Sequence, residues 1–214
     1  MIGNLIPYGI MLVTAGCALW RGAPYATLPF LGFMCLWYTI RMILTRGDDK
    51  PVVDEKDARR ERSLVILVGI GMVYVPIAVL AAPILDFAAY DALPGQIALG
   101  FLVGLLGAYI FWRSHADLGK NWSPHLELRE GHHLVTGGIY AWMRHPMYTA
   151  IFLINGAQML MLTNWIAGPL GLATFILLYL ARIGAEEEMM RESFAEEWEV
   201  YAANTPRLLP RRMR

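Results

Sequence analysis

Six apolar segments, separated by charged connections, constrain this chain more than any other feature of its sequence. A helix needs roughly 20 apolar residues to cross a bilayer, with a range of about 17–25. Of the 214 residues, 57% are hydrophobic and only 17% are charged, against about 25% charged residues in soluble domains. The pattern therefore predicts an all-α integral membrane protein with five to six transmembrane helices. The segments are about Leu5–Trp20, Pro24–Leu44, Leu64–Leu85, Gly95–Trp112, Tyr148–Leu162 and Trp165–Ala181.

Positive charge is distributed unevenly between the two sets of connections. Seven Lys and Arg residues lie between Arg41 and Arg62, and others follow at 113–144 and from residue 182 onward. The opposite connections carry one basic residue, Arg21. Since Lys and Arg mark the cytoplasmic side of membrane proteins, we expect both termini and three polar blocks, at 46–62, 113–144 and from residue 186, to be cytoplasmic.

Local signals add detail to this outline. The first polar block is interpreted as a solvated connector near anionic headgroups. Pro76 is expected to kink the third segment, and the pair Gly100 and Gly104 predicts close helix packing. The tail is predicted to be an amphipathic helix that packs on protein or lies at the interface and ends before Pro206 and Pro210. Its apolar stripe is Met189, Met190, Phe194, Trp198 and Tyr201.

Several classes of function lack their usual signals. The net charge is zero, which gives no basic field for nucleic acid. Cys17 and Cys35 both lie in apolar runs and are interpreted as packed residues. All five histidines fall between His115 and His145, but HExxH is absent and no cysteine accompanies them, so no metal site is predicted. The phosphate-binding GxGxxG and Walker patterns and the GxSxG elbow of serine hydrolases are also absent.

A helical hairpin is expected to gather ionisable groups at one depth. Pro146 suits the first turn of a helix; the chain then runs outward, turns at Thr163–Asn164 and returns to Arg182. One interpretation is a set of snorkelling side chains with an Arg–Glu pair that fixes the hairpin. The other is a site for a zwitterionic small molecule with an aromatic base, such as S-adenosylmethionine, although other ligands fit the same description. The groups brought together are Arg144, His145, Arg182, Glu186 and Glu187, beside Tyr140, Trp142 and Tyr148.

The sequence of this hairpin region resembles a known family. GHHLVTGGIYAWMRHPMY at 131–148 and RIGAEEEMM at 182–190, followed by Phe194, Trp198, Tyr201, Arg207 and Pro210, closely resemble the isoprenylcysteine carboxyl methyltransferase family. The resemblance covers about residues 113–210, and DLGKNWSPHLELREGH at 117–132 is similar to its bacterial branch. It implies an S-adenosylmethionine-dependent membrane enzyme, related to phospholipid N-methyltransferases, in the bacterial inner membrane.

The resemblance also implies a division of the chain and a set of residue roles. Residues 1–112 would form about four transmembrane helices, and 113–214 a catalytic region with the hairpin 148–183 and a cytoplasmic C-terminal helix. Arg144 and Arg182 would be catalytic and hold the acceptor. Ile139, Ala150 and Ala195 depart from the family, which often has proline, glycine and glycine there. The cofactor would contact His125, His132, His133, Leu134, Val135, Tyr140, His145, Pro146, Met147, Tyr148 and Glu186.

The acceptor is expected to be a lipophilic small molecule that carries a carboxylate or a thiol. Such a nucleophile is anionic or nearly so at neutral pH and needs no strong base, whereas an amine must first lose a proton and gains nothing from nearby arginines. Three alternatives remain: a phospholipid N-methyltransferase, an NAD(P)H-dependent membrane reductase of the sterol reductase type, and a non-enzymatic membrane protein. Membrane lipids are expected partners in every case, and nucleic acid in none.

Overall fold

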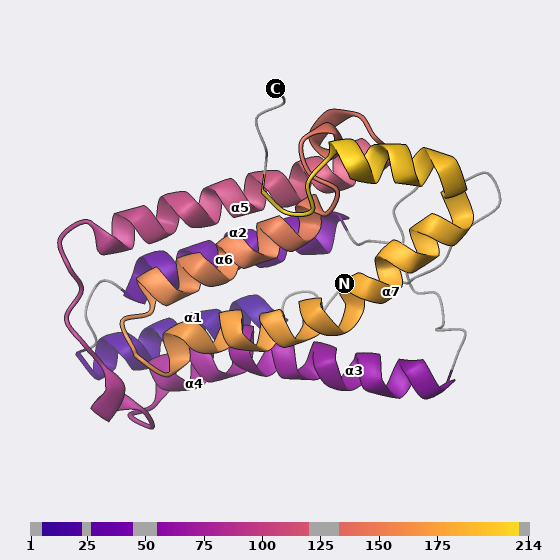
Figure 1. The fold of residues 1–214 in the computed structure, drawn as a ribbon. Coiled ribbons are helices and arrows are strands. Elements are labelled where there is room, and N and C mark those ends of the chain that lie inside the picture. Colours follow the sequence, from indigo (N-terminus) through magenta and orange to yellow (C-terminus); the bar gives the residue numbers. More distant parts are fainter. Residues whose placement is uncertain (1–5, 23–26, 45–54, 120–132, 210–214) are drawn as a thin grey trace.

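The structure is a bundle of helices, which confirms the predicted all-α class (Figure 1). This computed structural model describes residues 6–22, 27–44, 55–119 and 133–209. Within these ranges, the β-structure is limited to one isolated bridge between Ala89 and Asn164. The helices are α1 (Ile6–Trp20), α2 (Thr27–Leu44), α3 (Glu55–Gly69), η2 (Ile70–Tyr74), α4 (Val75–Ala81), η3 (Asp86–Ala88), α5 (Gln96–Leu118), η5 (Gly138–Ala141), α6 (Pro146–Met161) and α7 (Ala167–Asn204).

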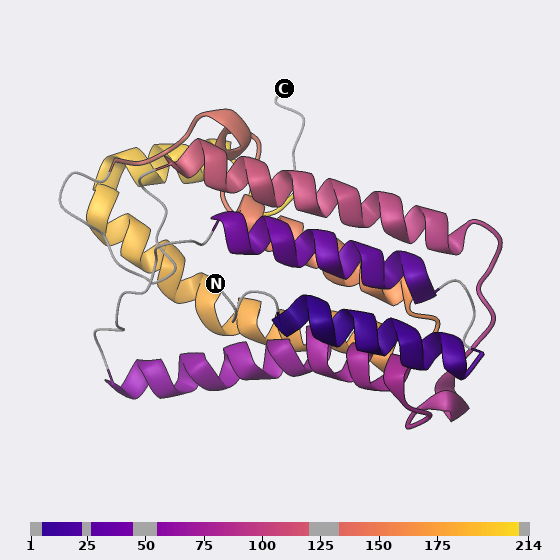
Figure 2. The same ribbon diagram turned by 180° about the vertical axis from the view of Figure 1, so that it is seen from behind.

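The long helices lie side by side in two layers. One layer contains α2, α5 and α6, and the other contains α1, α3 with α4, and α7, as Figures 1 and 2 show from opposite sides. Phe30 and Phe33 of α2 are almost fully buried in the core, together with Phe111 of α5 and Ile154 of α6. Large apolar side chains such as Leu180 remain exposed on the outside of the bundle, as expected for a surface that faces lipid.

Small residues allow α5 to approach its neighbours closely. A Cβ atom added at Gly100 would lie 2.7 Å from Met161 Cγ, and one added at Gly104 would lie 2.7 Å from Phe33 Cε2. At Gly107, one turn further along, it would lie 3.0 Å from the carbonyl oxygen of Ala150. The close packing predicted from Gly100 and Gly104 is therefore confirmed, and Gly107 extends it.

The third apolar segment, which Pro76 was predicted to kink, remains helical through the proline, and its one change of helix type precedes Pro76. Residues Ile70–Tyr74 form a π-helix between α3 and α4. Proline has no N–H to donate to the preceding turn, and a π-turn is a recognised way to accommodate such an interruption. The backbone carbonyl of Gly71 accepts a hydrogen bond from Gln158 Nε2 of α6 at 3.0 Å. A Cβ atom at residue 71 would lie 2.8 Å from the Leu170 carbonyl oxygen, so glycine lets α7 pack here.

Three helices of the described part are long and apolar enough to cross a membrane: Arg60–Ala81, Gln96–Leu118 and Ala167–Asn204. Helices at Ile6–Trp20 and Leu28–Leu44 are apolar but shorter. These findings support an integral membrane protein. The count of six crossings remains a prediction, because only half of the expected spans reach the required length.

The start of α3, the end of α5, the start of α6 and the second half of α7 lie at one end of the bundle (Figures 1 and 2). We call this the polar end. The connections at the opposite end hold Arg21, whose Nη2 lies 2.6 Å from Asp86 Oδ2. The hairpin geometry thus places the ionisable residues of α6 and α7 at the same depth.

Candidate functional site

The hairpin at the centre of the site forms as the sequence predicts. Pro146 occupies the first turn of α6 and is buried, a position where its missing N–H removes no helical bond. The turn into α7 is fixed by Asn164, whose Oδ1 accepts hydrogen bonds from the backbone N–H groups of Ile166 and Ala167. Asn164 Nδ2 donates to the Leu85 carbonyl at 2.8 Å, which ties the turn to the preceding connection.

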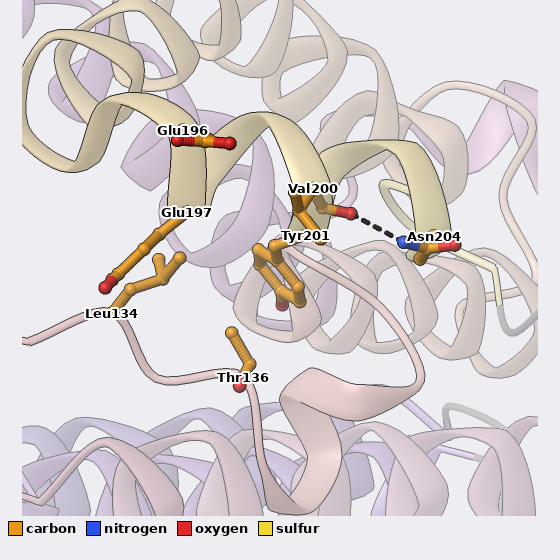
Figure 3. A pocket seen from close by; sticks show the side chains of 7 residues that line it. All are labelled: Leu134, Thr136, Glu196, Glu197, Val200, Tyr201 and Asn204. Carbon is orange, nitrogen blue, oxygen red and sulfur yellow. Dashed lines mark hydrogen bonds between the residues drawn. The ribbon is translucent and has the colours of Figure 1, made fainter.

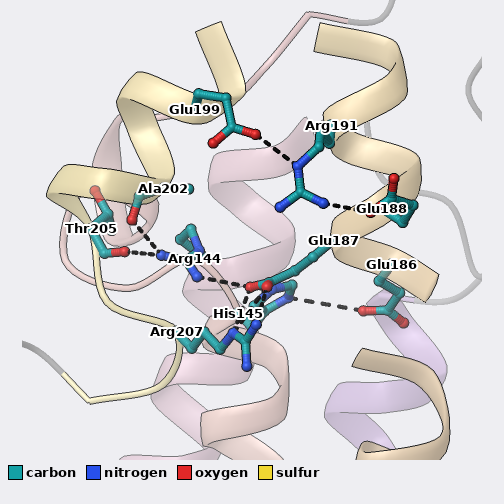
Figure 4. Close-up of polar contacts among 10 residues, drawn as sticks. All are labelled: Arg144, His145, Glu186, Glu187, Glu188, Arg191, Glu199, Ala202, Thr205 and Arg207. Atoms are coloured by element: carbon teal, nitrogen blue, oxygen red, sulfur yellow. Dashed lines mark hydrogen bonds and ion pairs between the residues drawn. The ribbon is translucent and has the colours of Figure 1, made fainter. Parts of the chain in front are cut away.

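Glu187 is the centre of the ionic network at the polar end (Figure 4). Its side chain is only 9% exposed and contacts three basic groups. Arg144 Nη2 lies 2.8 Å from Glu187 Oε1, His145 Nε2 lies 3.3 Å from the same oxygen, and Arg207 Nε lies 3.0 Å from Oε2. The contact with Glu187 raises the pKa of Arg207 above its ordinary value, so this guanidinium remains charged. A buried carboxylate needs such partners to remain stable.

Residues 205–209 lie against the start of α6 and close one side of this network. The backbone N–H groups of Arg144 and His145 donate to the carbonyls of Pro206 and Arg207 at 2.8 and 2.9 Å. Thr149 Oγ1 donates to the Leu208 carbonyl at 2.6 Å. Arg144 Nη1 also donates to the carbonyls of Ala202 and Thr205. Arg144 therefore joins the end of α7 to the hairpin.

Glu186 has a different set of neighbours from Glu187. Its Oε1 accepts a hydrogen bond from the Tyr148 hydroxyl at 2.5 Å and lies 3.3 Å from Arg182 Nε. Its Oε2 lies 3.9 Å from His145 Nδ1. The two adjacent carboxylates thus have different neighbours. Glu187 holds residues 205–209 through Arg144 and Arg207, whereas Glu186 faces Tyr148 and Arg182. His145 contacts both.

The first polar block contributes to the site, so its interpretation as a solvated connector is wrong for Glu61. Helix α3 begins at Glu55, nine residues before the predicted apolar segment. Glu61 Oε1 lies 3.3 Å from Arg182 Nη1, with the two side chains 26% and 21% exposed. The packing of α3 against α7 brings this carboxylate to the polar end, and sequence separation alone does not indicate that contact.

Aromatic side chains line the apolar side of Glu186. Tyr148 and Phe152 of α6 pack on Phe175 and Tyr179 of α7, with ring centroids 4.9–6.0 Å apart. Leu64 and Val68 of α3 contact the same cluster. Edge-to-face aromatic pairs at these separations are mutually attractive. The site therefore joins an ionic network to an apolar aromatic wall.

The second half of α7 turns back over the polar end, as Figure 1 shows. The turn occurs at Ala195, whose φ and ψ of 43° and −115° are not helical. After the turn, Trp198 and Tyr201 are buried, and Arg144 Cζ lies 5.7 Å from the Trp198 ring centroid. The predicted tail helix therefore packs on protein through Trp198 and Tyr201, but the prediction of one continuous amphipathic helix is wrong, because the helix is broken at Ala195. Arg191 spans the turn and contacts Glu188 before it and Glu199 after it.

Replacement of Ala195 by glycine is expected to stabilise the protein by about 1 kcal/mol. A left-handed conformation costs a residue with a Cβ atom roughly 1–2 kcal/mol and costs glycine little. The measurement is the thermal unfolding temperature of the detergent-solubilised protein. Ala203→Gly, at a helical position exposed on the same helix, is the matched control and is expected to destabilise. A lower unfolding temperature for Ala195→Gly would contradict the strained turn.

An open cleft of about 540 Å³ lies between this returning helix and the chain that precedes η5 (Figure 3). Leu134 and Thr136 form one side, and the other is formed by the returning helix. The Tyr201 hydroxyl donates to the Tyr140 carbonyl at 2.7 Å and so connects the cleft to η5. Burial raises the pKa of Tyr140, which keeps its phenol neutral. The residues of α7 that line the cleft are Glu196, Glu197, Val200, Tyr201 and Asn204.

The predicted site residues fall into three groups. His145, Tyr148, Arg182 and Glu186 come together as expected, and Arg144 joins them through Glu187. Leu134 lines the cleft. The Tyr140 carbonyl accepts a hydrogen bond from the hydroxyl of Tyr201, which also lines the cleft, and Met147 packs against the main core. His133 is exposed and Val135 is half-buried. His125 and His132 lie outside the described residues.

Sequence reasoning missed three contributors to the site. Glu61 was assigned to a connector, and Arg207 and the pair Glu196 and Glu197 were given no role. A usable signal exists for Glu61, because it lies three residues before Leu64, the first residue of an apolar segment. It therefore sits at the same boundary depth as Arg144 and Arg182. The cleft depends on the reversal of direction at Ala195, for which the only signal is the glycine that the resembling family often has at this position.

Comparison with known proteins supports the resemblance. Residues 98–192 match the sequence profile of the isoprenylcysteine carboxyl methyltransferase family. The chain is 31% identical over 115 residues to the protein-S-isoprenylcysteine O-methyltransferase of Schizosaccharomyces pombe, and this match covers 53% of the chain and 48% of the relative. It is 34% identical over 111 residues to the nickel-cobalt-cadmium resistance protein NccN of Alcaligenes xylosoxydans xylosoxydans, over 51% and 49% of the two chains. These matches span about half the length of the relatives.

The fold is also that of a solved structure. A eukaryotic intramembrane Ras methyltransferase, an isoprenylcysteine carboxyl methyltransferase, superposes with a TM-score of 0.60 at 22% identity. The superposition covers 96% of this chain and 74% of that one, so it extends to helices N-terminal to the family match at residues 98–192. The resemblance is thereby confirmed: from residue 98 to residue 192 this chain matches the isoprenylcysteine carboxyl methyltransferase family, on a fold shared with a methyltransferase of known structure.

Proposed function

We propose that this protein is an S-adenosylmethionine-dependent membrane methyltransferase that acts on the carboxylate or thiol of a lipophilic acceptor. The observation that carries the proposal is the arrangement at Glu186. One carboxylate faces Tyr148, His145 and Arg182 at the boundary between an ionic network and an aromatic wall. The names of the relatives and the family match point to the same activity.

The residues present suit a zwitterionic sulfonium cofactor. In the cleft, the carboxylates of Glu196 and Glu197 offer acceptors for ammonium or hydroxyl groups, and Leu134 and Tyr201 offer apolar and aromatic surface. Glu186 does not line the cleft and offers a further carboxylate at the hairpin. The cleft volume lies within the range of small-molecule sites, about 300–1,000 Å³. When bound, S-adenosylmethionine supplies an electrophilic methyl group: a bond forms from the acceptor to the methyl carbon, the carbon–sulfur bond breaks, and its electron pair remains on the neutral thioether.

Arg182 is proposed to hold the acceptor. Its guanidinium lies between Glu61 and Glu186, 21% exposed, beside Tyr148 and the aromatic wall. A guanidinium binds a carboxylate with a planar pair of donors, which fixes the direction of attack. The apolar body of the acceptor would lie along Phe152 and Tyr179. Orientation of this kind is the main requirement for a methyl transfer whose nucleophile is already charged.

Arg144 is proposed to position other residues and not to contact the acceptor itself. Its Nη atoms donate to Glu187 and to the carbonyls of Ala202 and Thr205. These bonds hold the end of α7 against the hairpin, which in turn shapes the cleft. Arg144 is therefore a positioning residue, and Arg182 is the cation available to the acceptor.

Two features support a cytoplasmic location for the polar end. Basic residues of the sequence cluster in the connections at this end, and Arg21 alone falls in the connections opposite. The proposed cofactor is water-soluble and reaches the protein from the cytoplasm. A bacterial inner membrane fits the resemblance of residues 117–132 to the bacterial branch.

Cofactor binding tests the proposed function first. Detergent-purified protein is expected to bind S-adenosylhomocysteine in calorimetry and not NADPH. Glu186→Gln should weaken binding of S-adenosylhomocysteine about tenfold or more, as expected when a charged hydrogen-bond partner is lost. Glu188→Gln, at an exposed position two residues further along the helix, should leave that binding unchanged. Binding of NADPH alone would refute the methyltransferase and favour the reductase. An equal loss of S-adenosylhomocysteine affinity in Glu186→Gln and Glu188→Gln would refute the role of Glu186.

A further inference from the structure

The guanidinium of Arg182 already lies beside two carboxylates of the protein. Its Nη1 lies 3.3 Å from Glu61 Oε1, and its Nε lies 3.3 Å from Glu186 Oε1. Across the whole network, Arg144, Arg182 and Arg207 face Glu61, Glu186 and Glu187. Three guanidinium groups thus oppose three carboxylates, and His145 lies beside two of these carboxylates, Glu186 and Glu187. An additional carboxylate from an acceptor would bring a negative charge into a partly buried cluster whose guanidinium groups are already paired, which is unfavourable unless a carboxylate of the protein moves away.

Glu61 is the carboxylate best placed to move. Glu187 is fixed by three basic groups and is 9% exposed, and Glu186 is bonded to the Tyr148 hydroxyl at 16% exposure. Glu61 is 26% exposed, and Arg182 is the partner that the structure shows for it. It also comes from α3, outside the hairpin that builds the rest of the network. Of the three carboxylates, Glu61 is the most exposed and has the fewest partners among the described residues, so its ion pair costs the least to break.

The guanidinium itself is incompletely satisfied. Arg182 Nε is buried and makes no hydrogen bond among the described residues, since its contact with Glu186 lacks the required direction. A buried donor without an acceptor is costly, so this guanidinium is not held as firmly as that of Arg207, whose Nε lies 2.9 and 3.0 Å from the two oxygens of Glu187. A guanidinium receives a planar carboxylate through two parallel N–H donors, and Nη1 is the donor that Glu61 occupies in this structure.

We propose that Glu61 holds Arg182 in the resting protein and that the carboxylate of the acceptor displaces it. This inference rests on the proposed function and makes its substrate class specific: the acceptor is an anion before the reaction. Transfer of the methyl group to the carboxylate oxygen removes that charge, and no proton has to move. The neutral ester then competes poorly for Arg182, Glu61 recovers its partner, and the product leaves. Glu61 is thus a competitor for the acceptor site, and its charge favours product release.

The test compares the affinities of N-acetyl-S-farnesylcysteine and of its methyl ester, measured by titration of the purified protein in nanodiscs. Glu61→Gln is expected to tighten binding of the acid roughly two- to fivefold, the factor that corresponds to a weak ion pair, and to leave the ester unchanged. The KM for the acid should fall in parallel. A purely structural role for Glu61 would weaken both ligands and raise KM.

Further variants keep the result interpretable. Asp86→Asn removes a carboxylate from another Arg–carboxylate pair, at the opposite end of the bundle, and should change neither affinity. Glu61→Asp keeps the charge on a shorter side chain and should give a smaller gain for the acid. In an Arg182→Gln background, Glu61→Gln should have no effect.

Three results would overturn the proposal: unchanged or weaker binding of the acid in Glu61→Gln, equal tightening of acid and ester, or a gain that persists without Arg182. S-adenosylhomocysteine binding is measured separately on the same preparations. Its absence from the wild-type protein would refute the methyltransferase, whereas the acid-to-ester comparison tests Glu61 alone.

Discussion

Replacing Glu187 with alanine is expected to lower the free energy of unfolding by about 3 kcal/mol, the scale of a buried ion pair that loses one partner. The change leaves Arg144, whose side chain is 10% exposed, without its carboxylate, and removes the contacts of Arg207 and His145. It also weakens the attachment of residues 205–209 to α6. Unfolding is measured by thermal or denaturant titration in detergent.

Limited proteolysis gives a local measurement of the same effect. Arg207 follows the end of α7, and its contacts with Glu187 hold the chain against α6. Trypsin should therefore cut after Arg207 faster in Glu187→Ala than in the wild type. Glu188→Ala is the matched control, because that side chain is 56% exposed and contacts only the surface residue Arg191 among the described partners. Equal rates of cleavage after Arg207 in Glu187→Ala and Glu188→Ala would contradict a central role for Glu187.

Replacing Arg182 with glutamine is expected to lower kcat/KM for a carboxylate acceptor roughly 10- to 100-fold, which corresponds to the 1.5–3 kcal/mol of a hydrogen bond to a charged group. The affinity for S-adenosylhomocysteine should remain within about twofold of the wild type, because Glu186 keeps its bond to Tyr148. Arg182→Lys should restore only part of the rate, since an ammonium cannot present the planar pair of donors.

The control for this variant is Arg191→Gln. Arg191 lies on the same helix and also contacts two carboxylates, but its side chain is 49% exposed. A loss confined to Arg182 identifies the acceptor site. A comparable loss of cofactor affinity in Arg182→Gln would contradict the separation of roles between Arg182 and Glu186.

Much of the hairpin could be predicted from sequence because its determinants are local. Pro146 begins α6, Asn164 caps the return, and helical spacing places Arg182 and Glu186 on one face. Helix geometry then brings the polar end together without further information. The close packing of α5 could be predicted for the same reason, because a local pattern of small residues indicates where another helix approaches.

The rest depends on tertiary packing. Whether Glu61 meets Arg182 is decided by the packing of α3 against α7 and not by any local pattern. The cleft depends on the reversal at Ala195. Alanine itself gives no signal for a positive φ, and the one indication is the glycine that the resembling family often has at this position. The different contacts of Glu186 and Glu187 also cannot be predicted from sequence, because two adjacent glutamates differ only in the neighbours that the fold gives them.

The product of the reaction provides the most direct test of the central claim. Purified protein in vesicles is incubated with methyl-labelled S-adenosylmethionine and N-acetyl-S-farnesylcysteine, and the labelled product is treated with alkali. We predict that the label appears in the acceptor, is released by alkali as methanol, and is lost in Arg182→Gln, since this identifies a methyl ester made at the proposed site. An alkali-stable label on the amine of a phospholipid headgroup, or transfer that is independent of Arg182, would contradict the account.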